Sequence, residues 1–210
     1  MLEYSVSTAD HVLTVSPDYA ESIKDHNSTI AAGLQDLYRE KNVIGFLNGL
    51  DTSIYDRCSE NFDSFLKVKQ KSKLELQKKL NLKVDNDVPL FSYICRLSDQ
   101  KGSPIVYDII DDIVSDGQFV LLGTGLEEFD IKFGELNGKL DNYVAIIDFD
   151  VELAKEIYLA SDFFLMPSYF EPCGIAQLIA LHYATLPIVT NIGGLKDTVN
   201  DYKSNDGNGF

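Results

Sequence analysis

The segment FFLMPSYFEPCGIAQ, residues 163–177, decides the fold of this chain. Its first four residues are apolar, as in a buried strand, and its last residues begin a run with apolar side chains at helical spacing. A Pro and a Gly between them mark a tight connection. A strand that leads through a short turn into a helix is the repeating unit of α/β folds, so the segment predicts such a fold.

The same alternation extends in both directions from this segment, beginning at Pro89. Short runs rich in Val, Ile, Phe and Tyr predict buried strands, and the longer runs between them predict amphipathic helices. The expected strands cover 90–96, 119–122, 143–147, 163–166 and 187–190; the expected helices cover 104–115, 126–136, 151–161 and 175–184. This regularity predicts a doubly wound parallel sheet, whose ligands bind at the carboxyl ends of the strands.

The first part of the chain has a weaker pattern. Residues His11–Ser16 resemble one more strand, and Ser16-Pro17-Asp18 is typical of a helix start because Pro suits the first helical position. An apolar run, Val43–Leu47, precedes a turn expected at Asn48-Gly49. We expect the main domain boundary there, between residues 1–47 and 48–210.

Two other stretches are polar. Residues 58–87 are rich in Lys and helical over 68–80, which predicts a surface connection. The final residues, 200–210, carry Asn, Asp, Ser and Gly, and we expect no strand or helix there.

Composition excludes several classes of function. The formal net charge is −15, which disfavours nucleic acid or an anionic membrane as a partner. Met1–Ser7 lacks the features of a signal peptide, and no apolar run is long enough to span a bilayer, so we expect a cytoplasmic protein. The three cysteines have no metal-binding spacing and are expected to be reduced: Cys58, Cys95 and Cys173. No metal site is predicted.

A basic pair follows the strand expected at 90–96. Arg96 and Lys101 flank a loop that opens a helix, so both side chains can point into the crevice toward one anion. A diphosphate is bound by this combination of a planar guanidinium, a point charge and free backbone N–H groups. An ordinary solvated loop is the alternative.

The next strand is followed by Gly123-Thr124-Gly125. Glycines in such a turn allow the backbone to approach a ligand closely. A tight strand-to-helix turn explains the same residues, and no third glycine completes a dinucleotide fingerprint.

The turn within residues 163–177 carries the strongest signal for a phosphorylated sugar. The N–H groups of Gly174, Ile175 and Ala176 would face the crevice at a helix N-terminus, where phosphate is favoured. Glu171 at the same rim can accept hydrogen bonds from sugar hydroxyls. A carboxylate that caps its own helix is the alternative.

Taken together, these segments resemble bacterial glycogen synthases and plant starch synthases over about residues 9–201. The motifs that carry the resemblance, in order, are Thr14-Val15-Ser16-Pro17, Leu47-Asn48-Gly49-Leu50-Asp51, Arg96-Leu97-Ser98-Asp99-Gln100-Lys101-Gly102, Leu122-Gly123-Thr124-Gly125, Phe170-Glu171-Pro172-Cys173-Gly174 and Gly193-Gly194-Leu195-Lys196-Asp197-Thr198-Val199.

The resemblance implies a GT-B glycosyltransferase with two facing Rossmann-like domains, of which the C-terminal one holds ADP-glucose. Such enzymes transfer glucose with retention to the non-reducing end of an α-1,4-glucan, release ADP and use no metal or other cofactor. By the same resemblance Arg96 and Lys101 are the catalytic cations that neutralise the departing ADP. Glu171 would bind glucose hydroxyls or stabilise the transition state.

The resemblance also implies the remaining substrate-binding residues. Phe149 stands where the family usually has a Tyr that stacks on adenine, and the amides after Cys173 would hold the distal phosphate. Asn48 and residues 123–125 complete the expected set. Ala176 replaces a common Thr beside the phosphate, which puts nucleotide affinity in question.

The family's N-terminal glycine loop, with its acceptor-site His and Asp, does not occur in this chain. The resemblance therefore implies that residues 1–47 are the end of the acceptor-side domain and its connection. Residues 48–210 would be a nucleotide-sugar-binding domain truncated at its C-terminus, inactive on its own. Two alternatives are a glycosyltransferase of the same fold with another sugar nucleotide, and a truncated homologue that only binds nucleotide or glucan.

Overall fold

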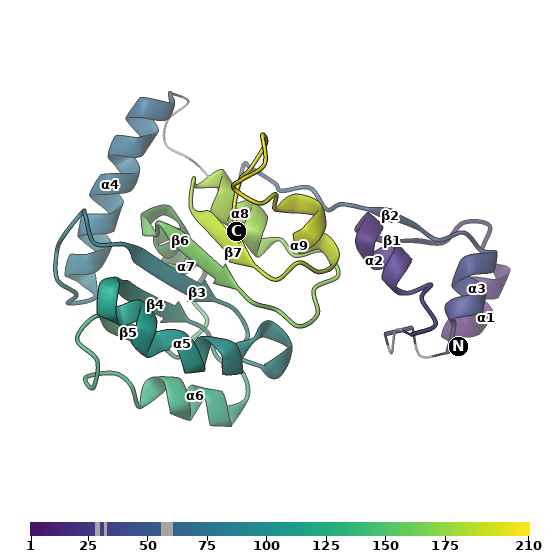
Figure 1. Cartoon of the computed structure of the whole chain (residues 1–210), viewed down its shortest axis with the longest axis horizontal. Coiled ribbons are helices and arrows are strands. Elements are labelled where there is room, and N and C mark those ends of the chain that lie inside the picture. Colours follow the sequence, from purple (N-terminus) through teal and green to yellow (C-terminus); the bar gives the residue numbers. More distant parts are fainter. Residues whose placement is uncertain (28–29, 32, 56–60) are drawn as a thin grey trace.

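The computed structural model describes residues 1–27, 30–31, 33–55 and 61–210, which form two parallel sheets (Figure 1). The smaller sheet pairs β1 (Leu13–Val15) with β2 (Ile44–Phe46). Three helices accompany it: α1 (Leu2–Thr8), α2 (Pro17–Ser22) and α3 (Gln35–Glu40). These elements lie at the end of the molecule that carries the N-terminus, away from the larger sheet (Figure 1).

The larger sheet has five parallel strands in the order β5-β4-β3-β6-β7. They are β3 (Leu90–Ile94), β4 (Gln118–Leu122), β5 (Tyr143–Ile146), β6 (Phe163–Met166) and β7 (Leu186–Val189). The helices are α4 (Phe62–Lys79), α5 (Ser103–Asp116), α6 (Glu127–Gly134), α7 (Val151–Ala160), α8 (Ala176–His182) and α9 (Gly193–Thr198), with a 3₁₀ turn η1 (Asp99–Lys101) before α5.

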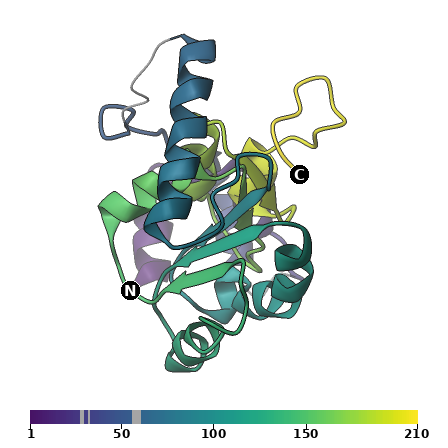
Figure 2. The same cartoon turned by 90° about the vertical axis from the view of Figure 1, so that its left-hand side faces the viewer.

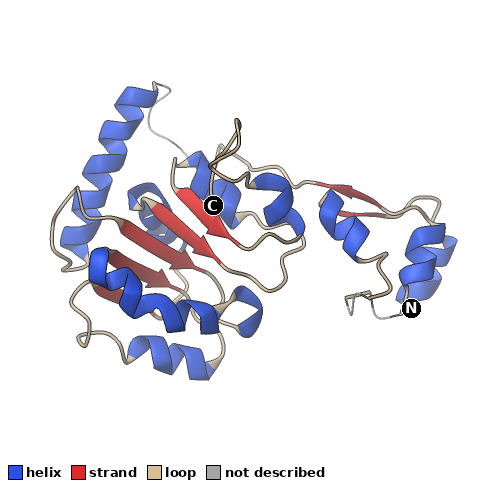
Figure 3. Cartoon of the chain, viewed as in Figure 1, coloured by secondary structure: helices blue, strands red, loops and turns tan. Residues whose placement is uncertain are grey.

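Helices cover both faces of this sheet (Figures 2 and 3). Every residue of β4 is buried. Because alternate side chains of a strand point to opposite faces, Phe119 and Leu121 pack with residues of α5 and α6, while Val120 and Leu122 pack with residues of α4 and α7. The continuous apolar runs in the sequence arise from this double covering. The prediction of a doubly wound parallel sheet is confirmed.

The strand order places a switch point at the centre of the sheet. From β3 the chain continues outward to β4 and β5, and α7 then carries it back to β6 on the other side of β3. The loops after β3 and β6 therefore leave in opposite directions and open a crevice between them. These are the two loops that carry Arg96, Lys101 and Glu171.

One expected turn is wrong. Residues 47–50 run extended between the two sheets, with no turn at Asn48-Gly49. The backbone N–H of Asn48 instead donates to the Sγ atom of Cys173 at 3.4 Å. Asn48 thus contacts the loop after β6 of the larger sheet instead of forming a turn.

The expected Lys-rich surface connection is also partly wrong. Helix α4 packs against α7, and Lys69 and Lys73 on its inner face are buried. Cys58 and residues 56–60 lie outside the described residues, whereas Cys95 and Cys173 are free thiols, as expected. Helix α1 was not expected, and Phe210 exchanges two backbone hydrogen bonds with the edge of β7 although no strand was expected there.

Candidate functional site

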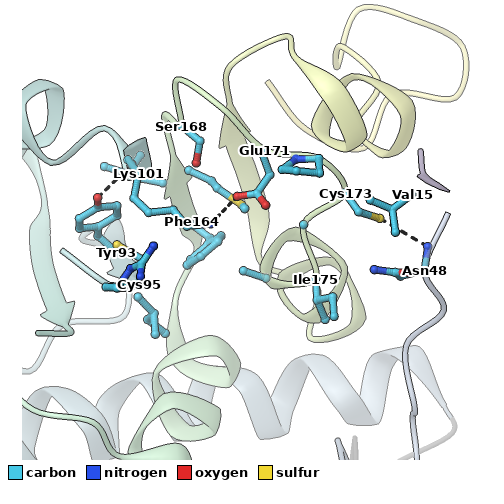
Figure 4. Close-up of a pocket in the computed structure, with 17 residues that line it drawn as sticks. Val15, Asn48, Tyr93, Cys95, Lys101, Phe164, Ser168, Glu171, Cys173 and Ile175 are labelled. Atoms are coloured by element: carbon cyan, nitrogen blue, oxygen red, sulfur yellow. Dashed lines mark hydrogen bonds and ion pairs between the residues drawn. The ribbon is translucent and has the colours of Figure 1, made fainter. Parts of the chain in front are cut away.

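Two adjoining cavities open at the carboxyl ends of the strands. The first has a volume of about 510 Å³ and is lined by residues that include Lys101, Glu171 and Asn48 (Figure 4). The second has a volume of about 490 Å³ and is lined by residues that include Phe149. Both cavities are bordered by Ile94–Arg96, so one extended ligand can occupy the two together.

The loop after β3 holds Lys101 in place through its backbone. The buried Tyr93 hydroxyl donates to the carbonyl oxygen of Lys101 at 3.0 Å. Gly102 has φ +79°, and a Cβ there would lie 2.1 Å from the Pro167 carbonyl oxygen, so this close approach requires glycine. Tyr93 was missed by the sequence analysis; the signal was a Tyr hydroxyl within a mostly apolar strand that is expected to be buried.

Lys101 and Glu171, predicted to bind different parts of the donor, form an ion pair. The Nζ–Oε2 distance is 2.5 Å, and the exposed fractions of the side chains are 23% and 9% (Figure 4). A carboxylate this deeply buried requires a partner, because an unpaired buried charge is costly. Any anion that enters the first cavity competes with Glu171 for the ammonium group of Lys101.

Among the described residues Arg96, unlike Lys101, has no carboxylate partner. Its side chain is exposed and borders both cavities. Within the part of the chain that the structure describes, the guanidinium forms no ion pair. Its positive charge at the junction is therefore available to a ligand.

The loop after β6 and the start of α8 line the first cavity. In the described residues the amides of Gly174, Ile175 and Ala176 donate to no protein acceptor, and all three residues line the cavity. Gly174 has φ +74°. The Cys173 side chain is buried and accepts from Asn48, so any ligand contact here is made beside the thiol.

Gln177 stabilises this loop through side-chain hydrogen bonds, and it was also missed by the sequence analysis. Its Nε2 donates to the carbonyl oxygens of Cys173 and Gly174 at 3.0 and 3.2 Å, and to the Thr198 hydroxyl. The side chain is fully buried. A Gln on the first turn of a helix that otherwise turns apolar residues inward was the available signal.

The Gly123-Thr124-Gly125 turn is explained mainly by the protein itself. A Cβ at Gly123 would lie 2.0 Å from the Cys95 carbonyl oxygen, and a Cβ at Gly125 would lie 2.0 Å from that of Leu97. The Thr124 hydroxyl donates to Asp130 at 2.8 Å. Gly123 and Thr124 line the second cavity, whereas Gly125 lines neither one. The glycines are required where the loops after β3 and β4 touch.

Phe149 lies in the loop after β5 with 81% of its surface exposed, and it lines the second cavity. An exposed aromatic ring at a cavity provides a stacking surface for a planar ligand. Of the two flanking carboxylates, Asp150 caps α7 by accepting from the Leu153 amide at 2.9 Å. This acidic residue beside the cavity thus has a local structural role.

Cys95, beside Arg96 in the wall that the two cavities share, is uncharged. Burial raises the pKa of the Cys95 thiol to about 12, so it is neutral near pH 7.

Among the described residues there is no cluster of His, Cys, Asp and Glu that would hold a metal ion. No helix in the described ranges has the length and apolar character needed to cross a membrane.

Comparisons with known proteins agree with this geometry. Residues 73–210 match the family of group 1 glycosyl transferases. Over essentially its whole length the chain is 42% identical to a glycogen synthase of Lactococcus lactis and 42% identical to that of Bacillus subtilis, and over 96% of its length it is 44% identical to that of Clostridium acetobutylicum. The chain spans less than half of each of these relatives, 44–46% of their lengths.

A similar solved structure is the catalytic domain of starch synthase IV from Arabidopsis thaliana bound to ADP and acarbose. The TM-score is 0.89 at 32% identity, covering 100% of this chain and 46% of that one. The Rossmann-like, GT-B fold inferred from the motifs is confirmed. Because the family match covers well over half of the sequence, the chain belongs to the group 1 glycosyltransferase family.

Proposed function

We propose that this chain is the donor-binding part of a glycogen synthase that transfers glucose from ADP-glucose to the non-reducing end of an α-1,4-glucan with retention. The observation that carries the proposal is the pair of joined cavities with Arg96 at the junction and Lys101 beside Glu171. The relatives at 41–44% identity are glycogen synthases, and the similar starch synthase structure holds ADP, which supports the same donor.

In this proposal each part of the donor has its own surroundings. The base stacks on Phe149 in the second cavity, and the diphosphate lies at the junction beside Arg96. The glucosyl group enters the first cavity, where Glu171 accepts hydrogen bonds from its hydroxyls. The amides of residues 174–176 donate to the phosphate nearest the sugar, while Asn48 and Gly123–Thr124 border the ligand.

The basic residues of the site contribute to the reaction by stabilising negative charge. The bond between the anomeric carbon and the phosphate oxygen breaks, and its electron pair passes to ADP. Arg96 and Lys101 stabilise the negative charge that develops on the leaving group. The acceptor hydroxyl then bonds to the anomeric carbon and passes its proton to the phosphate oxygen of the departing ADP. Two cations meet the need for neutralisation, so the proposal includes no metal ion or other cofactor.

The ion pair between Lys101 and Glu171 gives this scheme an order of events. Without nucleotide, Lys101 neutralises the buried Glu171 carboxylate. When the diphosphate arrives, Lys101 shares its charge with the phosphate, and Glu171 gains freedom to accept sugar hydroxyls or to face the positive charge at the anomeric carbon. Donor binding therefore prepares the carboxylate for transfer.

The remaining parts of the reaction lie with the rest of the enzyme. We assign residues 1–47 to the end of the acceptor-side domain and its connection, and residues 48–210 to the nucleotide-sugar-binding domain. The glucan binds between this domain and the acceptor-side domain, which excludes water when the two close. The cytosol remains our expected compartment.

Calorimetric titration of this chain with ADP, UDP and GDP at low salt tests the donor assignment. We expect ADP to bind and the other two to bind at least about tenfold more weakly, a difference of about 1.4 kcal/mol. Tighter binding of UDP or GDP than of ADP would favour a different sugar nucleotide, and equal affinities would mean that this chain does not select the base. Absence of binding in a folded sample would contradict the proposal of a donor site on this chain.

A further inference from the structure

The smaller sheet and the candidate donor site meet at a reciprocal contact between α2 and α9. The Asp18 carboxylate accepts from the Gly193 amide at 3.0 Å, the first residue of α9, and also pairs with the ammonium group of Lys196. In return, the backbone N–H of Asp18 donates to the Asp197 carboxylate at 2.9 Å. Each helix therefore supplies a carboxylate to an N–H group in the first turn of the other.

This contact reaches the Glu171 loop through two glycines. The Gly194 amide donates to the carbonyl oxygens of Glu171 and Pro172 at 3.2 and 3.1 Å. A Cβ at Gly193, where φ is +46°, would lie 2.1 Å from the Glu171 carbonyl oxygen. The start of α9 is thus held between Asp18 on one side and the backbone of Glu171 on the other.

Two further contacts join the same regions. The Tyr19 and Phe170 rings meet edge to face with centroids 5.7 Å apart, and the Asn48 amide donates to Cys173. The backbone conformation just before Asp18 is also constrained. Ser16 is buried with φ 59°, and its hydroxyl accepts from the Tyr19 amide at 3.0 Å. A non-glycine residue keeps such a backbone angle only where its surroundings determine it.

We propose that Asp18 is a positioning residue of the donor site, which ties residues 16–19 to the loop that carries Glu171 so that donor binding and the placement of the N-terminal region are coupled. The proposal rests on the proposed function, because it takes residues 171–176 as the place where the donor's phosphate and sugar bind. Asp18 touches no part of the donor; it acts through Gly193. The ion pair raises the pKa of Lys196, so that side chain stays charged opposite Asp18 over the ordinary pH range.

Hydrogen exchange followed by mass spectrometry, with and without ADP, tests the coupling. Coupling between two sites is reciprocal. In the unmodified chain we expect ADP to slow exchange in residues 170–176 and also in residues 17–22, by about threefold or more in each. In Asp18→Ala the slowing in 17–22 should disappear, and ADP affinity measured by calorimetry should fall about three- to tenfold.

Two comparison variants separate positioning from general loss of charge or fold. Asp18→Asn keeps an oxygen that can accept from Gly193, so it should retain most of the ADP effect on residues 17–22; it also carries the test if Asp18→Ala does not fold. Glu156→Ala removes a matched ion pair, with Lys79 at 2.6 Å on the far side of the domain, and should leave both readouts unchanged.

Failure of this proposal can be distinguished from failure of the proposed function. If the unmodified chain does not bind ADP, the donor assignment fails first. If it binds ADP and residues 170–176 are slowed while residues 17–22 are not, Asp18 is not a positioning residue. Unchanged ADP affinity and exchange in Asp18→Ala would overturn the proposal equally.

Discussion

Two lysines at opposite ends of the same sheet differ in what their ammonium groups contact. Lys101 lies at the carboxyl ends of the strands and pairs with one carboxylate beside an open cavity. Lys69 lies at the amino ends, 8% exposed, and donates to the carbonyl oxygens of Leu159 and Ser161 at 3.1 and 2.5 Å and to the Thr185 hydroxyl at 2.7 Å.

A cavity alone does not distinguish the two places. Lys69 and its neighbour Lys73 also line a cavity, of about 300 Å³. The difference is that three protein acceptors surround the amino group of Lys69, and Lys73 pairs with Asp162 at 2.6 Å. Lys69 therefore stabilises the fold, whereas Lys101 lies beside an open cavity and next to Arg96, which forms no ion pair within the described residues, so a ligand can reach this positive charge.

The largest effect we expect is on stability, from Lys69→Met. Methionine fills similar volume but cannot donate, so the two carbonyl groups at the end of α7 lose a buried partner. At pH 8 we expect the free energy of unfolding to fall by about 2–4 kcal/mol, measured by urea denaturation, with ADP affinity unchanged. A variant as stable as the unmodified chain would mean that these hydrogen bonds contribute nothing net.

The next prediction concerns how the difference in unfolding free energy between the unmodified chain and Lys69→Met changes with pH. Burial lowers the pKa of Lys69 to about 7; Asp162 opposes the shift and Lys73 adds to it. Between pH 7 and about 10 the unfolded chain therefore binds more protons than the folded one, and stability due to Lys69 rises with pH. The difference in unfolding free energy from Lys69→Met should grow over this range, by up to about 1.4 kcal/mol per pH unit. A constant difference would contradict the lowered pKa.

Lys101→Ala should change binding where Lys69→Met changes stability. Loss of one charge-assisted contact costs about 1.5–3 kcal/mol, so ADP affinity should fall about 10- to 100-fold by calorimetry. Lys79→Ala is the matched control, because it removes the same charge from an exposed pair with Glu156 and should leave affinity unchanged. Equal ADP affinity in Lys101→Ala would remove this residue from the phosphate site.

Glu171→Gln should produce the smallest change in binding, and in the opposite direction. The carboxylate holds Lys101 and repels the diphosphate, so its removal should leave ADP affinity equal or raise it about two- to fivefold, a change of about 0.4–1 kcal/mol. In the complete enzyme the same change should reduce glucose transfer strongly. Markedly weaker ADP binding would instead place Glu171 among the nucleotide contacts.

Much of the larger sheet and its helices could be predicted because the signals are local. Strands buried on both faces produce continuous apolar runs, so residues 163–166 were bounded correctly and the other four strands to within two residues. The loops that follow them could be located for the same reason. The roles of the residues in those loops stay predictions, although most of them do line the two cavities.

Local pattern misled where the deciding contact came from elsewhere. Lys69 and Lys73 look like residues of a solvated helix face, because nothing nearby in the sequence reveals the acceptors that bury them. Asn48-Gly49 is a common turn pair, but the chain forms no turn there, and the Asn48 amide instead contacts the thiol of Cys173. A Cβ at Gly125 would lie 2.0 Å from the Leu97 carbonyl oxygen, a contact that the turn pattern does not reveal, and the expected ligand contact of Gly125 stays a prediction.

By itself, the sequence determined the fold class, the family and the two loops in which a donor site should lie, since apolar periodicity and short motifs are properties of neighbouring residues. Only the tertiary structure decided the pairing of Lys101 with Glu171, 70 positions apart, and of Asp18 with Gly193, 175 positions apart. Such contacts depend on strand order and on how the loops leave the sheet. No local pattern encodes these, because they follow from packing the whole chain at once.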